Sequence, residues 1–148
     1  MGDAAMTSAM LSTPRHHTTA SYHLSAPADV TTPRLARQFV TGALQATRHA
    51  TLIDNACVCV SDVVTNVVQH ARVTDLSVEL TAYADRVVIG VRDADPTRRP
   101  ARRRARPDDE RGRGLALVQT LADSCGMALV WDRLTVTGKL FWFELRDS

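Results

Sequence analysis

The polar residues with the most suggestive spacing are Asp62, Asn66 and His70, which lie four positions apart. On a helix, side chains at this spacing stack on one face. A carboxylate beside an amide oxygen suits a magnesium-associated site, because magnesium prefers oxygen ligands and keeps several of its waters. Asp62 could also orient or deprotonate a nucleophilic hydroxyl group. Taken alone, the pattern is more typical of a polar helix face that contacts solvent.

A glycine turn is the second feature that could bind a ligand. Gly112 and Gly114 stand directly before Leu115, where an apolar helix is predicted to begin. Glycines let a backbone approach a ligand closely, and the free amides of a helix N-terminus suit phosphate. The turn is not a dinucleotide fingerprint, because Leu117 stands where the third glycine would be.

The segment from Val91 to Pro96 is the third feature, since a predicted strand ends there in two carboxylates, Asp93 and Asp95. An aspartate that leaves a strand into a pocket could accept a hydrogen bond from the amino group of adenine. Alone, a turn is the simpler interpretation, because aspartate and proline both favour turns.

The elements that would position these residues follow from the hydrophobic pattern. We expect a first strand near residues 22–24, helices over 33–49 and 53–71, and a strand pair at 76–80 and 86–92. A loop over 93–113, a helix over 115–122 and strands over 127–131 and 140–145, joined by a turn near Thr137 and Gly138, complete the chain. This order predicts an α+β fold: a two-layer α/β sandwich with a mixed, mostly antiparallel sheet and helices on one face.

Length and composition indicate one globular domain. The chain has 148 residues, of which 45% are hydrophobic. We expect a mobile tail over residues 1–20 and a domain over 21–148. The three cysteines show no metal-ligand spacing and are interpreted as reduced thiols of a cytoplasmic protein. No apolar run reaches the roughly 18 residues of a membrane helix, so we expect no membrane contact.

Four segments in this order resemble the anti-sigma factor serine/threonine kinases, which belong to the ATPase superfamily shared with gyrase, a heat-shock chaperone and the histidine kinases. The segments read SDVVTNVVQHA, VRDADP, GRGLALVQTLAD and GKLFWFEL. The resemblance covers roughly residues 25–148. It implies the ATPase fold of that superfamily, which agrees with the architecture expected from the hydrophobic pattern.

The resemblance also implies roles for single residues. Asn66 would help to hold the Mg²⁺ of a bound ATP, and Asp62 would be the catalytic base. Asp93 would accept a hydrogen bond from the adenine amino group, Gly112, Gly114 and Leu115 would lie at the phosphates, and residues 96–111 would form a lid. The implied partners are a sigma factor and an anti-sigma antagonist protein, and a homodimer is expected.

Two departures from the family pattern keep a second hypothesis open. The family usually has glutamate at the position of Asp62, and aspartate is shorter by one bond, about 1.5 Å. A misplacement of about 1 Å can lower a rate on the order of a hundredfold, so the domain could bind ATP and transfer no phosphate. Asp95 and Thr97 stand where glycines are expected, which predicts a differently shaped adenine wall.

Nucleic-acid binding is a third hypothesis, based on the arginine-rich run between residues 98 and 106. Such a run could neutralise phosphates. However, Asp108, Asp109 and Glu110 follow at once, and no aromatic residues interleave for base stacking. The net charge of +2 adds little. We therefore favour a solvated lid and expect no direct nucleic-acid binding.

Overall fold

The order of secondary-structure elements agrees with the predicted order. A computed structural model describes residues 18–95 and 110–148 of the chain. The first half contains β1 (Thr18–Pro27), α2 (Thr32–Ala46), the short 3-10 helix η2 (Ala50–Leu52) and α3 (Ile53–His70). The second half contains β2 (Asp75–Tyr83), β3 (Arg86–Asp93), α4 (Glu110–Leu121), β4 (Ser124–Asp132) and β5 (Thr135–Arg146).

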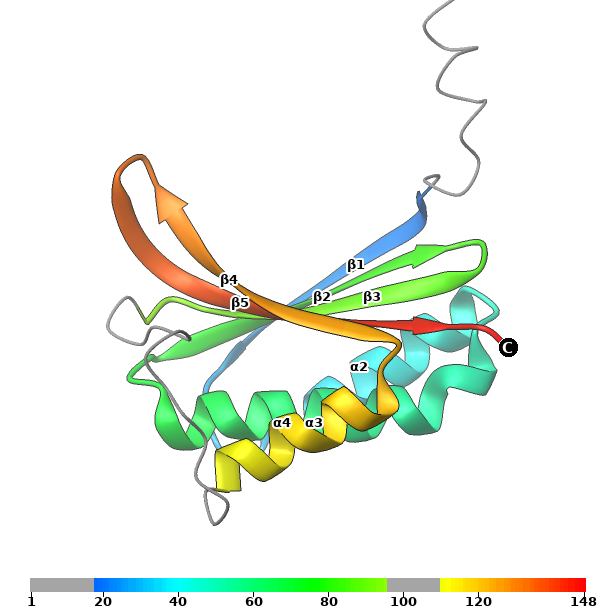
Figure 1. Cartoon of the computed structure of the whole chain (residues 1–148), viewed down its shortest axis with the longest axis horizontal. Coiled ribbons are helices and arrows are strands. Elements are labelled where there is room, and N and C mark those ends of the chain that lie inside the picture. The colour runs from blue at the N-terminus through cyan, green and yellow to red at the C-terminus, as the bar shows by residue number, and fades with distance from the viewer. Residues whose placement is uncertain (1–17, 96–109) are drawn as a thin grey trace, which may run out of the picture.

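The strands form one five-stranded sheet in the order β1-β2-β3-β5-β4. Each neighbouring pair of described strands is antiparallel. The three α-helices cover one face of the sheet and leave the other face uncovered (Figure 1). The predicted α+β sandwich is therefore confirmed, with a sheet that is antiparallel throughout its described strands.

The core lies between this sheet face and the helices. Strand residues alternate between the two faces, so every second side chain of β2, β3 and β5 points into the core. Helix α3 contributes a stripe of small apolar side chains at helical spacing. The largest fully buried side chains include Phe143, Leu44, Leu80, Ile89, Leu145, Val60 and Val64.

Helix α3 is the central helix of the layer and packs between α2 and α4. Together with η2 it forms a stretch, Ala50–His70, whose mean hydropathy of 1.3 and length would allow it to cross a membrane by composition alone. Packing in the core explains the apolar composition of α3, because its residues Val60, Val63, Val64 and Val67 are buried there.

The connection between the last two strands differs from the prediction. Asp132 pairs with Thr135, so the turn lies at Arg133 and Leu134 and not near Thr137 and Gly138. Gly138 lies inside β5, where a Cβ atom would stand 2.0 Å from the carbonyl oxygen of Asp93. A glycine that looked like a turn residue is therefore needed for close approach of two backbones.

The N-terminal boundary also differs from the prediction. Strand β1 begins at Thr18, because its backbone pairs with β2 from that residue onward. Residues 18–20, which were assigned to the tail, therefore belong to the sheet. The rest of the predicted tail, residues 1–17, lies outside the described part of the chain.

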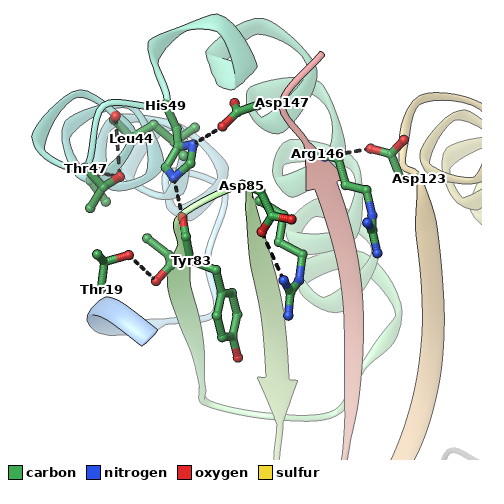
Figure 2. Close-up of polar contacts among 12 residues, drawn as sticks. Thr19, Leu44, Thr47, His49, Tyr83, Asp85, Asp123, Arg146 and Asp147 are labelled. Carbon is green, nitrogen blue, oxygen red and sulfur yellow. Dashed lines mark hydrogen bonds and ion pairs between the residues drawn. The ribbon is translucent and has the colours of Figure 1, made fainter. Parts of the chain in front are cut away.

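A buried histidine ties the C-terminal end of β5 to the rest of the domain (Figure 2). The His49 side chain is 3% exposed. Its Nε2 donates to the carbonyl oxygen of Tyr83, which only accepts, at 2.8 Å, and its Nδ1 lies 2.9 Å from Asp147 Oδ2. The Asp147 amide in turn donates to the carbonyl oxygen of Asp85 at 3.0 Å. These contacts join the α2–η2 loop, the β2–β3 turn and the chain end.

Candidate functional site

The polar stripe predicted on one helix lies on α3 as expected. Asp62, Asn66 and His70 are all half-buried rather than fully exposed. The Oδ2 atom of Asp62 is fully buried and has no hydrogen-bond partner among the described residues. A buried carboxylate oxygen without a partner costs free energy. The stripe therefore does not fit a solvent-facing helix surface.

The environment of Asp62 changes its acidity. Burial raises the pKa of its carboxyl group above the usual value. The neighbouring Cys59 thiol has its pKa raised to about 12, first by burial and then by the negative charges of Asp62 and Cys125. A carboxylate with a raised pKa is better suited to take a proton near neutral pH.

The raised pKa of Asp62 predicts how stability depends on pH. The folded state holds the Asp62 proton more tightly than the unfolded state, whose value is near 3.8. The contribution of this group to stability is therefore favourable at low pH and falls as pH rises from 3.8 through the folded pKa. Asp62→Asn should exceed the wild-type free energy of unfolding most at pH 7. Urea unfolding between pH 4 and 7 measures this, and a difference that is constant with pH would contradict it.

Asp93 ends β3 on the face of the sheet that the helices cover. Its side chain is only 1% exposed. Its Oδ1 accepts the backbone N–H of Asp95 at 2.9 Å, and its Oδ2 lies 3.5 Å from Lys139 Nζ. The pKa of Asp93 is raised above its usual value, chiefly by burial and also by the charge of Asp95, although the Asp95 N–H and the Lys139 charge act to lower it. Each carboxylate oxygen has a second lone pair, so the group can still accept a hydrogen bond from a ligand.

Asp95 connects this strand end to helix α3. It is 1% exposed, and its Oδ2 accepts the backbone N–H of Arg72, just beyond the end of α3, at 3.0 Å. Neither Arg72 nor Lys139 was among the residues predicted for the site. Lys139 could have been found from the pairing of β3 with β5, because that register places it directly opposite Asp93. Opposite charges at such positions stabilise a sheet.

The glycine segment is placed differently from the prediction. Helix α4 begins at Glu110, so Gly112 and Gly114 lie within its first turns and not in a turn ahead of Leu115. Glycine costs little in a first turn, whose amides have no intrahelical partners in any case. This accounts for Gly112, whereas Gly114 is the fifth residue of α4 and lies beyond the first turn. Leu115 is half-buried and packs against the core. The free amides available to a phosphate therefore belong to a helix that starts earlier than expected.

The elements that carry these residues lie together. Helix α4 packs along α3, and Figure 1 places the start of α4, the C-terminal half of α3 and the end of β3 on the same side of the molecule. The hydrogen bond from the Arg72 N–H to Asp95 Oδ2 links the segment after α3 to the segment after β3. Residues 96–109 of the predicted lid, with Thr97 and the arginine run, lie outside the described residues, whereas residues 110 and 111, the end of the predicted lid, belong to α4.

Two clefts lined by described residues lie away from Asp62 and Asn66. One, of about 410 Å³, opens on the uncovered sheet face and touches Asp93, Arg92 and Thr137. The other, of about 500 Å³, lies between α2 and α3 beside Arg37 and Cys57. The chemistry of the α3 stripe favours the corner between α3, α4 and β3 over these clefts, because neither cleft is lined by Asp62, by Asn66 or by the start of α4.

The residues present fit a magnesium ion that is held mainly by a nucleotide. Within the described ranges, no three His, Cys, Asp or Glu side chains gather as a metal site. Magnesium commonly binds through one or two protein oxygens together with substrate phosphates and waters. The buried oxygen of Asp62, one turn from Asn66 on α3, fits such a hydrated ion. Asn66 would supply the direct oxygen ligand.

Comparison with known proteins agrees with this geometry. Residues 26–138 match the family described as the histidine kinase-like ATPase domain. No curated protein matches the chain significantly. The matched residues include α3, the end of β3, α4 and Gly138, and cover most of the chain. Family membership implies ATP binding, usually together with Mg²⁺. The chain belongs to the histidine kinase-like ATPase domain family.

Proposed function

We propose that this domain is an ATP-dependent regulator that binds a sigma factor and phosphorylates a serine or threonine of a small antagonist protein. The observation that supports phosphate transfer best is the buried, unpartnered Oδ2 of Asp62, one helical turn from Asn66. A base with a raised pKa and a free oxygen can take the proton of a substrate hydroxyl. The choice of partners rests on the resemblance of the sequence motifs to the anti-sigma factor kinases. We also propose that the protein acts as a homodimer in the cytoplasm.

Each residue has a defined task in the proposed reaction. Asp62 accepts the proton as the hydroxyl oxygen of the substrate bonds to the γ-phosphorus of ATP, and the bond from that phosphorus to the bridging oxygen of ADP breaks. Asn66 would hold a magnesium ion, whose charge would neutralise the phosphates as in phosphoryl transfer generally. Asp93 accepts a hydrogen bond from the adenine amino group. The N-terminal amides of α4 face the phosphates.

A second function is an ATP-binding or protein-interaction module that transfers no phosphate. The observation that favours it is Asp62 itself, because aspartate places its carboxylate about 1.5 Å short of the position that glutamate would reach. The pocket would then still bind ATP through Asn66, Asp93 and α4. Partner binding would depend on the nucleotide, without turnover.

Incubation with γ-labelled ATP and candidate antagonist proteins distinguishes the two functions. The kinase proposal predicts label on a serine or threonine of one antagonist, dependent on Mg²⁺. The module predicts nucleotide binding without label on any partner. Light scattering during size-exclusion chromatography tests the dimer, and a mass equal to one chain would contradict it.

A further inference from the structure

Three charged side chains lie together at the end of β3, where Asp93 is proposed to bind the nucleotide base. Asp93 is almost fully buried, and Lys139 Nζ lies 3.5 Å from its Oδ2. Lys139 stands opposite Asp93 in the register of β3 and β5, on the helix-covered side of the sheet, and it is the only lysine in the chain. Its side chain is 15% exposed. The ammonium group is thus held against the carboxylate with little access to solvent.

The third charge is Asp95, a residue that stands where the family pattern expects glycine. It is buried, donates its N–H to Asp93 Oδ1 and accepts the N–H of Arg72. A glycine could donate the same N–H but could not add a carboxylate. The charge of Asp95 raises the pKa of Asp93, in the same direction as burial. A motif with glycine at this position would lack that effect. In this chain, a cation beside Asp93 is therefore more important for keeping its carboxyl group ionised.

Lys139 supplies that cation. Among the described residues, the charged groups that act on Asp93 are Lys139 from β5 and Asp95 from the segment after β3. The residue paired with Asp93 on β2 is the uncharged Leu76. Arg72 contacts the cluster through its backbone N–H to Asp95. Of these groups, Lys139 is the one whose charge favours the ionised form of Asp93.

We propose that Lys139 makes the pocket selective for adenine by holding Asp93 as an ionised hydrogen-bond acceptor. This inference rests on the proposed nucleotide site. An ionised carboxylate only accepts hydrogen bonds, so it suits the amino group of adenine. Hypoxanthine and guanine carry a carbonyl oxygen at that ring position, and two acceptors would then face each other. A protonated Asp93 would lose this discrimination, because its O–H could donate to the carbonyl oxygen.

The test compares the dissociation constants of ATP and inosine triphosphate, which differ at this ring position. We expect the wild-type protein to prefer ATP by about tenfold or more, as for hydrogen bonds to charged groups. Lys139→Met should lose most of that preference, and its ATP affinity should rise with pH as Asp93 ionises. Lys139→Arg keeps the charge and should retain the preference. Asn66→Ala is the matched control and should weaken both nucleotides equally, because it acts at the phosphates.

A purely structural role of Lys139 would give a different result. If Lys139→Met binds ATP with an unchanged preference over inosine triphosphate and an unchanged pH profile, the inference is wrong, although the nucleotide site stands. If the wild-type protein binds neither nucleotide, the proposed function itself fails. Should Lys139→Met not fold, Lys139→Gln replaces it, because it also removes the charge but keeps a long polar side chain. Loss of the ATP preference in Lys139→Gln is expected, and a preference equal to that of the wild-type protein would overturn the inference.

Discussion

Asp62→Asn should lower phosphate transfer to the antagonist by about 10²–10⁴-fold, the usual contribution of a general base. The amide keeps the shape of the side chain but cannot take the proton of the attacking hydroxyl. Transfer is measured as label moved from γ-labelled ATP to the partner. Asp62→Glu should act in the opposite direction. It restores the longer side chain and should raise the rate on the order of a hundredfold if reach limits the reaction.

Binding measurements separate catalysis from damage to the fold. Asp62→Asn should still bind Mg-ATP, because Asn66, Asp93 and the amides of α4 are unchanged. It should also unfold at no lower urea concentration than the wild-type protein at pH 7, since burial of the Asp62 charge is unfavourable. Undiminished transfer in Asp62→Asn would exclude this residue as the base. Loss of transfer together with loss of ATP binding would mean that Asp62 acts in binding.

Gly138→Ala should destabilise the domain by about 1–3 kcal/mol, the range for overpacking a well-packed site. The added Cβ would lie 2.0 Å from the carbonyl oxygen of Asp93 and 3.0 Å from the Cα of Ala94. Both are backbone atoms, so they cannot move aside as a side chain could. The strands β3 and β5 would have to separate at the point where Asp93 meets Lys139. Chemical denaturation gives the change in the free energy of unfolding.

Gly42→Ala is the matched control for this substitution. Gly42 lies in the middle of α2, and an added Cβ would meet nothing within 4 Å. Alanine is favoured over glycine in a helix interior by roughly 0.5–1 kcal/mol, so this variant should be more stable than the wild-type protein. Equal effects of the two substitutions would contradict the close approach of β5 to Asp93.

The sequence predicted elements best where one periodicity extended over many residues. The valines of α3 favour strands by propensity, yet their spacing correctly predicted a helix. The helical period continues over the 18 residues of α3, and such a length favours a helix over a strand. Short signals were less reliable. Gly138 was interpreted as a turn residue, since nothing local distinguishes a glycine that frees backbone for a turn from one that makes room for another strand.

The candidate site was predicted in the same uneven way. Asp62, Asn66 and Asp93 could be named from spacing and motif order, because each motif is contiguous in the chain. Lys139 and Arg72 could not, because they reach the site only through the pairing of β3 with β5 and through a backbone amide beyond α3. Such contacts depend on register and chain direction, which short motifs do not contain. The start of α4 was missed because glycines commonly end helices and here lie near a beginning.

The most direct test of the nucleotide site is a melting curve of the purified protein with and without Mg-ATP, repeated with Asn66→Ala. A ligand at about 100 times its dissociation constant adds ~2.7 kcal/mol of stability. The proposed site predicts a rise of several degrees in the wild-type protein and its loss in Asn66→Ala, with both proteins melting alike in the absence of nucleotide. An unchanged melting temperature at millimolar Mg-ATP, or a rise that Asn66→Ala retains in full, would contradict a nucleotide site built around Asn66.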